Sequence, residues 1–455
     1  MNTLKSIFFT TMVTIIGIAF SGCSDDDDPI PPFSITFSTA ELGISSDNTE
    51  AEATVTFSRP ATVSGAVILS LEPGGLVYGE SNDYYASVEP EGNNITLPFV
   101  SGDQSVSVTF FAGSASAIET EQTLSVILVE DSDNTFTIGT TGTLSVVFAE
   151  NFVSPGSSVQ LDAGGPEFVK QAFIDLSKQA VSNTDKNTWD LAFLSNGFHV
   201  TLNATEEIMA RQLTDKTSLA EVTASDTTNF AQEMVIGPFS SLAAREWIDD
   251  PSGDLTKTAI AAISENNDDN KVYIVKRDAG NWKKIKVDRS GDNYSIQFAD
   301  IGSTSFEEVI IQKDDTYNAV FFSLDDQVAL FEPEKGQWDF MYGTYTTFST
   351  FGEPIPYNFS DYIVINRNGT ESAMVMIDDN TTYEDFDLSA ASTIDFSTEF
   401  NIIGSSWRDV FSGTVRSDRF YVIKDIDGNI YKLRFTKLTG DDDERGRPSL
   451  TYELL

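Results

Sequence analysis

The stretch Asn187-Thr-Trp189-Asp190-Leu-Ala-Phe193 decides the fold, because a second copy follows at Gly336-Gln-Trp338-Asp339-Phe-Met-Tyr342. The two tryptophans are 149 positions apart (338 − 189). Val272-Tyr-Ile-Val-Lys276 recurs as Phe420-Tyr-Val-Ile-Lys424 at almost the same offset, 148 (420 − 272). The sequence therefore predicts a tandem duplication.

The duplicated unit is long, and Phe173-Ile-Asp-Leu176 also recurs, as Phe321-Phe-Ser-Leu324. A repeat longer than about 50 residues is large enough for a small core of its own. We therefore expect two related β-modules, at 155–305 and 306–455. For the pairs Trp189-Asp190 and Trp338-Asp339 we predict a structural role, in which the indole closes the core at a strand start and the carboxylate caps the entering turn.

Composition limits the possible functions. A chain of 455 residues predicts about three domains of ~150 residues, and 40% hydrophobic residues with 33 Phe supply sizeable cores. Seventy acidic against 28 basic residues give a formal charge of −42. Such a field repels nucleic acid and anionic membranes. It suits cations or basic partners, but a solvated acidic exterior is the favoured explanation.

The N-terminus predicts export and lipid anchoring. Residues 1–22 read as a signal peptide, in which Lys5 precedes an apolar run from Ile7 to Phe20 that is shorter than the ~20 residues of a membrane span. Phe20-Ser-Gly-Cys23 resembles the bacterial lipobox, which makes Cys23, the single cysteine, the predicted site of lipidation. An ordinary secretory signal with an incidental cysteine is the alternative.

Residues 23–32 read as a tether, because Asp25 to Asp28 are acidic and Pro29, Pro31 and Pro32 stiffen the chain. The acidic run resembles the tether of exported lipoproteins of the Bacteroidetes. This resemblance implies an outer-membrane lipoprotein that faces the extracellular side and touches the membrane only through its lipid anchor.

Residues 33–150 predict a β-sandwich of about seven strands, because five segments alternate apolar and small polar residues between turn signals: 53–57, 67–71, 105–110, 124–128 and 144–148. Asp83-Tyr84 and the stretch Ile118 to Leu124 resemble the Calx-β family, an Ig-like sandwich. In that family comparable acids help to hold calcium, which prefers six to eight oxygen ligands. The resemblance implies a calcium site drawn from Glu41, Asp83, Glu119, Glu121 and Asp131, and acidic loops without metal are the alternative.

The remaining chain also predicts strands, so the fold class is all-β with a few short helices. We expect helices at 240–247 and near 256–264. Strict alternation from Tyr431 to Leu438, preceded by a hairpin turn at Asp427-Gly428-Asn429, predicts a closing hairpin. The chain ends on a predicted strand, 450–454.

Taken together, Trp-Asp-x-Ala-Phe, the later Tyr-x-x-Lys stretch and the closing hairpin resemble the HmuY family over 155–455. This resemblance implies a surface lipoprotein of the Bacteroidetes that binds haem and delivers it to a TonB-dependent transporter for iron acquisition. Known members hold the iron between two histidines, one directly after Trp-Asp-x-Ala-Phe, where this chain has Leu194 and Gly343. His199 is the single histidine, and haem iron also accepts methionine. The candidate axial ligands are therefore His199, Met209, Met341, Met374 and Met376.

Three functional classes follow. The first is a non-catalytic protein that binds haem, a related porphyrin or another apolar ligand. The second is an adhesion or glycan-capture lipoprotein, with Trp247, Trp282 and Trp407 as stacking platforms. The third, an enzyme, is disfavoured because one histidine and one cysteine leave triad, thiol-protease and zinc mechanisms without their parts, and no nucleotide-binding motif is present.

Overall fold

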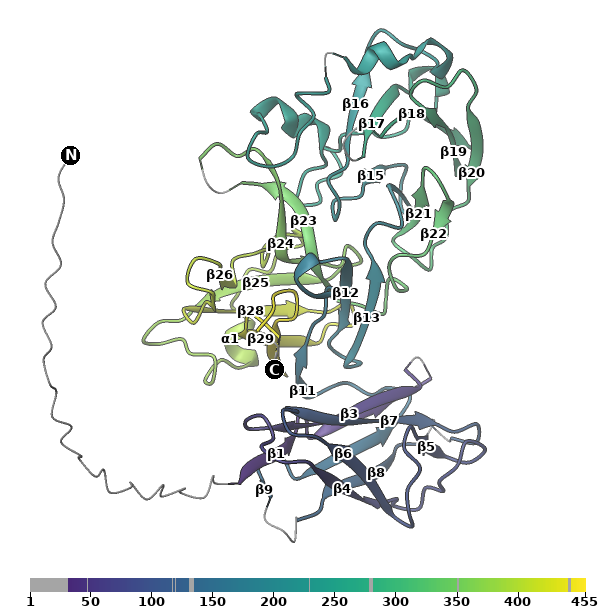
Figure 1. Ribbon diagram of the computed structural model, residues 1–455. Helices are drawn as coiled ribbons and strands as arrows, with labels where there is room; N and C mark the ends of the chain where they lie inside the picture. Colours follow the sequence, from purple (N-terminus) through teal and green to yellow (C-terminus); the bar gives the residue numbers. More distant parts are fainter. Residues whose placement is uncertain are drawn as a thin grey trace, which may run out of the picture.

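The structure is a computed structural model that describes residues 32–46, 48–116, 118, 120–130, 135–228, 230–277, 281–349, 352–440 and 443–455. The predicted signal peptide, Cys23 and the acidic run lie outside these residues, as do the calcium candidates Glu119 and Asp131. Strands account for 43% of the described residues and helices for 6% (Figure 1). The predicted all-β fold is confirmed.

Ten strands form an N-terminal β-sandwich of two five-stranded sheets, where about seven strands were predicted. One sheet has the order β5 (Tyr84–Ala86), β7 (Ser105–Ala112), β3 (Glu50–Phe57), β1 (Phe33–Phe37) and β9 (Phe136–Ile138). The other has the order β2 (Glu41–Ile44), β10 (Thr143–Phe148), β8 (Gln122–Leu128), β4 (Gly65–Glu72) and β6 (Asn94–Phe99). The five predicted segments lie within β3, β4, β7, β8 and β10.

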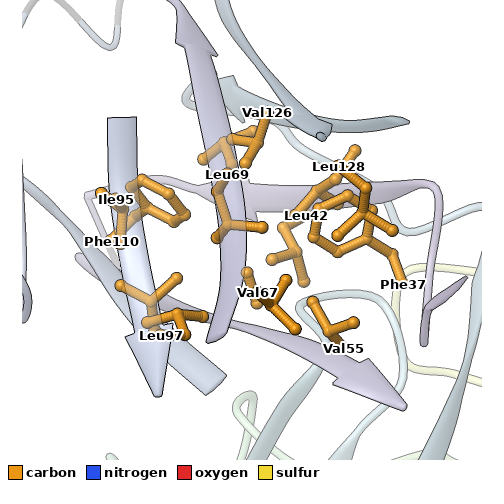
Figure 2. Packing of buried hydrophobic residues seen from close by; sticks show 14 of the residues in the cluster. Phe37, Leu42, Val55, Val67, Leu69, Ile95, Leu97, Phe110, Val126 and Leu128 are labelled. Atoms are coloured by element: carbon orange, nitrogen blue, oxygen red, sulfur yellow. The ribbon is translucent and has the colours of Figure 1, made fainter. Parts of the chain in front are cut away.

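The sandwich core forms because alternate residues of each strand point inward. Figure 2 shows Phe37, Val55 and Phe110 of one sheet against Val67 and Leu69 of the other. Val55, Val67 and Leu69 have no exposed surface. Each fully buried side chain of this size contributes roughly 1.5–3 kcal/mol to stability.

Two further five-stranded sheets follow in the second part of the chain. The repeat-1 sheet has the order β16 (Met209–Leu213), β17 (Val272–Lys276), β18 (Trp282–Ser290), β19 (Asn293–Asp300) and β20 (Glu307–Ile311). The repeat-2 sheet has the order β25 (Glu371–Met376), β28 (Arg419–Lys424), β29 (Ile430–Lys437), β30 (Ser449–Leu454) and β11 (Gly156–Gln160). The strand orders match, but β20 and β11 each come from the other repeat.

Two four-stranded sheets, the junction sheets, lie between them. The first has the order β13 (Ala180–Asp185), β12 (Lys170–Asp175), β23 (Phe340–Phe348) and β24 (Pro356–Ile365). The second has the order β22 (Gln327–Ala329), β21 (Ala319–Ser323), β14 (Leu191–Leu194) and β15 (Val200–Leu202). Each consists of one hairpin from each repeat.

The two repeats are therefore interleaved. β12 pairs with β23 through Ala172 and Tyr342, and β14 pairs with β21 through Leu191 and Phe322. In Figure 1, β12 and β13 lie among strands of the second repeat, beside β23. Neither repeat has a set of sheets to itself, although the boundaries at 150, 155 and 305 stay a prediction.

Helices are short and lie in connections: η1 (Gly165–Glu167), η2 (Leu219–Glu221), η3 (Ala224–Thr227), η4 (Leu242–Trp247), η5 (Asn267–Asp269) and α1 (Leu388–Ala391). η4 falls within the predicted helix 240–247. The helix predicted near 256–264 is wrong, because side chains hold this segment as a loop. Asp254 accepts the Thr256 N–H at 2.9 Å, and Tyr273 accepts the Ala261 N–H at 3.0 Å, and such bonds compete with helix formation.

The predicted closing hairpin is present. β28 and β29 pair across a turn in which Gly428 has φ 90°, a conformation that favours glycine. β30 pairs with both β29 and β11, which fixes the last residues in a sheet. A small additional ribbon, β26 (Arg408–Asp409) with β27 (Thr414–Val415), lies in the connection before β28.

Candidate ligand-binding site

The repeated Trp-Asp pairs join the two repeats reciprocally. Oδ2 of Asp190 accepts the N–H of Leu324 at 2.7 Å, and Oδ2 of Asp339 accepts the N–H of Leu176 at 2.7 Å. Leu176 and Leu324 occupy equivalent positions in the repeats. Each aspartate therefore fixes the strand end of the opposite repeat, as a buried carboxylate with a backbone donor does.

The tryptophans show the same reciprocity. Trp189 lies edge-on to Phe321 with ring centroids 4.8 Å apart, and Trp338 lies edge-on to Phe173 at 5.1 Å. Both indoles are less than 8% exposed. The two equivalent aromatic pairs form the centre of one shared apolar cluster.

A cavity of about 130 Å³, the central cavity, opens at this cluster between the repeats. Its walls are mostly apolar and come from both repeats. They include Phe173, Trp189, Leu194, Phe321, Phe331, Trp338, Met341, Tyr345, Val364 and Phe400. The repeats thus share one apolar site.

Four carboxyl groups line this cavity, those of Asp249, Asp250, Asp254 and Glu332, and burial raises the pKa of two of them. Asp249 accepts the N–H groups of Leu202 at 2.6 Å and Ala259 at 2.9 Å, and burial raises its pKa to about 6. Glu332 accepts the N–H of Asn318 at 2.7 Å, and burial raises its pKa to about 7. Desolvation disfavours the charged form of a carboxyl, so both groups hold a proton more readily than in water.

Among the described residues that line the cavity, Arg367 is the one with a cationic side chain. Its Nη1 donates to the carbonyl oxygen of Gly253 at 3.2 Å, and its guanidinium lies over the ring of Phe400 at 4.4 Å. Burial lowers the pKa of Arg367. The guanidinium is therefore a partly desolvated charge that faces an apolar space.

Ala204 occupies the position equivalent to Arg367. Asn203 donates to the Trp189 carbonyl at 2.8 Å, and Asn366 donates to the Trp338 carbonyl at 2.7 Å, so the two asparagines correspond. The residue after each asparagine, Ala204 or Arg367, lines the cavity. The shared site therefore carries a positive charge on one side of the duplication only.

Of the candidate axial ligands, only Met341 lines the cavity, and Met341 is 7% exposed. Leu194, at the position of the family histidine, is also a wall residue, whereas Gly343 is not. His199 lies in the turn before β15 and outside the lining. Its pKa is lowered by burial and by the charges of Arg367 and Lys313.

The remaining methionines lie elsewhere. Met209 is buried in a separate cluster with Trp247, and Met374 and Met376 are 42% and 48% exposed on β25. The Trp candidates of the glycan hypothesis are mostly inside: Trp247 and Trp407 are 7% and 1% exposed. These residues do not converge with the central cavity, and their assigned roles stay predictions.

Sequence reasoning missed Asp249, Glu332 and Arg367. None belongs to a recurring motif, and each lies in a connection between strands. The one available signal was the asparagine that follows each Trp-Asp hairpin, Asn203 in one repeat and Asn366 in the other. Aligning these two asparagines makes Arg367 the equivalent of Ala204. This signal appears only when the two repeats are aligned by their hydrogen bonds.

A second cavity of about 550 Å³, the polar cavity, lies on the other side of Trp189. Its lining includes Lys186, Asp190, Glu206, Glu207 and Arg277. Lys186 lies 3.5 Å from Glu206, and Arg277 lies 2.7 Å from Asp190. Four of these five charged groups are thus paired with each other.

The calcium candidates in the described part of the sandwich are Glu41, Asp83 and Glu121. Asp83 accepts the N–H of Val77 at 2.7 Å, a bond within its own loop. Glu41 has a raised pKa from burial and from nearby Glu121. Over the described ranges, no three His, Cys, Asp or Glu side chains form a metal site. Calcium binding stays a prediction.

In the described part of the chain, no helix has both the length and the apolar character needed to cross a membrane.

Comparisons with known proteins identify the second part of the chain. The family model described as HmuY protein matches residues 168–298 and again 290–452, more than half of the chain in all. No curated protein matches the sequence.

Solved structures give weaker likenesses. The crystal structure of the apo form of the Calx CBD1 domain is 14% identical with a TM-score of 0.22, and the match covers 26% of this chain and 96% of that chain. A putative lipoprotein from Bacteroides fragilis is 11% identical with a TM-score of 0.15, over 66% of this chain and 90% of that chain. A two-domain protein with unknown function from the same species is 12% identical with a TM-score of 0.20, over 28% and 52%.

Proposed function

The chain belongs to the HmuY family, and from that premise we propose that it is a surface-exposed outer-membrane lipoprotein that captures haem or a related porphyrin for uptake. It acts by binding alone and passes the ligand to a TonB-dependent transporter. The observation that carries the proposal is the apolar central cavity, which equivalent aromatic residues of both repeats line together. Such a cavity with few polar groups is the usual form of a site for a small apolar ligand.

The lining suits the faces of a porphyrin better than it suits the iron. Trp189, Trp338 and Phe331 offer flat apolar contact. Among the described wall residues, the soft donor suited to haem iron is the thioether of Met341, since Leu194 takes the place of the family histidine. Met341 is thus the proposed axial ligand, and iron coordination adds to binding without being its main source.

A porphyrin needs the cavity to widen. An apolar cavity of ~150 Å³ holds a molecule the size of benzene, so about 130 Å³ is too small. Two bonds from the second repeat hold the loop 249–258 at the site: Ser252 O accepts the Phe400 N–H at 3.1 Å, and Gly253 O accepts from Arg367 at 3.2 Å. Both bonds open when the ligand enters.

The test is a titration of residues 33–455 with haemin, followed by the Soret band in both oxidation states. We expect a saturable one-to-one complex, a shifted band for Met341→Leu, and no change for His199→Ala. Met209→Leu is the matched control, because Met209 is buried outside the cavity. If His199→Ala lost the band shift, the axial ligand would be His199 and not Met341. The absence of any saturable complex would overturn the proposal.

A second candidate function, glycan capture, is favoured by the polar cavity. It offers about 550 Å³ of space with Trp189 as one wall and paired carboxylates and cations around it, a set of groups suited to hydroxyl-rich ligands. Calorimetry with a panel of oligosaccharides tests it. Binding that Glu207→Gln weakens and haemin does not compete would support glycan capture, and no heat with any sugar would exclude it for that panel.

A further inference from the structure

Two residues that line the central cavity have hydrogen-bond donors that the protein leaves without acceptors. Nε1 of Trp189 and Nε1 of Trp338 are both buried, and neither donates to any acceptor among the described residues. Both indoles line the cavity, at equivalent positions of the two repeats. Because a buried N–H without an acceptor costs about 1–3 kcal/mol, the pair indicates acceptor atoms that a ligand supplies.

The third donor is charged. Arg367 has five N–H donors, of which the Gly253 carbonyl takes one. No carboxylate of the described chain lies within ion-pair distance of this guanidinium, although Asp249 and Glu332 also line the cavity. Arg367 therefore has N–H donors without an acceptor among the described residues, at a half-buried position.

The carboxylates of the cavity are already occupied. Each oxygen of Asp249 accepts a backbone N–H, and both oxygens of Glu332 accept from Asn318. Asp250 accepts from Ser252 at 2.6 Å, and Asp254 lies 2.8 Å from Lys257. The acids thus accept hydrogen bonds from the loops that surround the cavity, whereas the two indoles and Arg367 offer donors.

We propose that the central cavity selects an apolar molecule that carries a carboxylate, and that Arg367 binds this carboxylate. The inference rests on the proposed function only in taking the central cavity as the ligand site. A planar guanidinium matches a carboxylate in two parallel bonds, and a charge-assisted bond is stronger in a desolvated site than in water. The indole N–H groups then donate to further acceptor atoms of the ligand.

Taking up the carboxylate also opens the site. The guanidinium that would bind the ligand is the group that holds Gly253 of the covering loop. A carboxylate competes with a neutral carbonyl for the same donors and is the stronger acceptor. Ligand entry and release of the loop 249–258 are therefore coupled through one side chain.

Two sources provide such a molecule: a porphyrin with propionate groups and a long-chain fatty acid. The test uses residues 33–455 with four probes in matched pairs. Protoporphyrin IX is compared with its dimethyl ester by quenching of tryptophan fluorescence, and hexadecanoic acid is compared with hexadecanol by calorimetry. The variants are Arg367→Met, which removes the charge, and Arg367→Lys, which keeps the charge without the fork.

We expect the native chain to bind the acid of at least one pair tenfold or more tightly than its neutral counterpart. Arg367→Met should abolish this preference, and Arg367→Lys should keep part of it. Arg434→Met is the control, because Arg434 also lies over an aromatic ring, that of Tyr383, but away from the cavity. If Arg367→Met fails to fold, the inference is tested by the ratio of the affinities for the acid and the neutral probe, measured for the native chain and for Arg367→Lys.

Equal affinity for acid and neutral probes in the native chain would overturn the inference, as would a preference that survives in Arg367→Met. Failure of the proposed function is distinguishable. If neither porphyrin binds but hexadecanoic acid binds and hexadecanol does not, the porphyrin proposal fails and the carboxylate inference stands. If no probe of either pair binds, both fail.

Discussion

The carboxylate of Asp190 lies 2.7 Å from Nε of Arg277, whereas the equivalent Asp339 has no cation opposite it in the described structure. The position equivalent to Arg277 is Asp425. Burial, followed by the charge of Asp175, raises the pKa of Asp339 well above its usual value, and Asp425 adds to this effect. Burial also raises the pKa of Asp190, but there Arg277 favours the charged form. One half of the duplication thus contains a buried ion pair, and the other contains a group of carboxyls with no cation to favour ionisation.

This difference predicts opposite effects of two matched substitutions. A carboxyl whose pKa is higher in the folded than in the unfolded chain binds its proton more tightly when folded, so stability is greatest at low pH. This contribution to stability is lost as the pH rises above about 3.9, the pKa of an aspartate in the unfolded chain. Asp339→Asn keeps an acceptor for the Leu176 N–H and cannot ionise. We expect it to reduce the loss of stability between pH 5 and pH 8, measured by urea unfolding.

Asp190→Asn serves as the comparison. It leaves Arg277 without its buried partner, and breaking a buried pair costs roughly 3–5 kcal/mol; the second partner of Arg277, Asp325, reduces that cost. We therefore expect lower stability at both pH values. Equal unfolding curves for the two variants would contradict the assignment of different roles to the equivalent aspartates.

Glu332 gives a second prediction of pH dependence, at the central cavity. Burial raises its pKa from 4.5 to about 7, so the folded chain takes up a proton that the unfolded chain has released between these values. Stability therefore falls as pH rises from about 4.5 to about 7. The loss is on the order of 1–3 kcal/mol.

Glu332→Gln should remove this loss, because the amide oxygen still accepts from Asn318 and carries no charge to desolvate. Thermal unfolding at pH 5, 6, 7 and 8 measures the slope. Glu334→Gln, an exposed neighbour, is the control and should follow the native chain. A native slope retained in Glu332→Gln would show that another group is responsible.

Much of the fold could be predicted from the sequence, because alternation and turn residues report local structure. The five sandwich strands, the Gly428 hairpin and the final strand all follow from such patterns. The interleaving of β12 with β23 could not be predicted, because Ala172 and Tyr342 are far apart in sequence and either repeat could have paired with itself. The same limit hid Arg367, which joins the cavity only through this exchange.

Lys284 and Lys432 show a further limit of pattern reading. Alternation on β29 places Lys432 on the outer face, yet it is 5% exposed, because the connection after β25 covers that face. Its Nζ donates to the carbonyl of Tyr383 at 2.8 Å. Lys284, at the equivalent position of β18, donates to Leu219 and Val222 at 3.0 and 2.9 Å.

These contacts predict that the hydrogen bonds of Lys284 hold the connection between β16 and β17 against the sheet. Lys284→Met leaves the carbonyls of Leu219 and Val222 without their donor. Loss of such bonds costs on the order of 1–3 kcal/mol, partly offset by removal of a buried charge. We expect faster hydrogen exchange in residues 214–228, measured by mass spectrometry, with β19 unchanged.

Lys286→Met, on the same strand, provides the control. Lys286 lies 3.4 Å from Asp288 in a more exposed pair, which contributes little. Faster exchange in both variants alike would indicate a general loss of stability. If residues 214–228 stay protected from hydrogen exchange in Lys284→Met, Lys284 does not hold this connection against the sheet.

The exchange of strands predicts how the repeats behave when separated. Residues 306–455 alone lack β11, β12 and β14, which pair with β30, β23 and β21 in the full chain. The fragment therefore exposes three unpaired strand edges and the apolar cluster around Phe321 and Trp338, a combination that promotes aggregation or pairing with a second copy. We expect neither 151–305 nor 306–455 to be a folded monomer alone.

Mixing the two fragments should restore a one-to-one complex, because each supplies the strands the other lacks. Analytical ultracentrifugation gives the stoichiometry, and the near-ultraviolet dichroism of Trp189 and Trp338 reports their shared packing. The sandwich fragment 33–150 serves as the control, since its two sheets pair only within themselves, and it should fold in either case. A monomeric 306–455 that unfolds cooperatively would mean that the second repeat can pair its strands internally, and the exchange would then be one of two available arrangements.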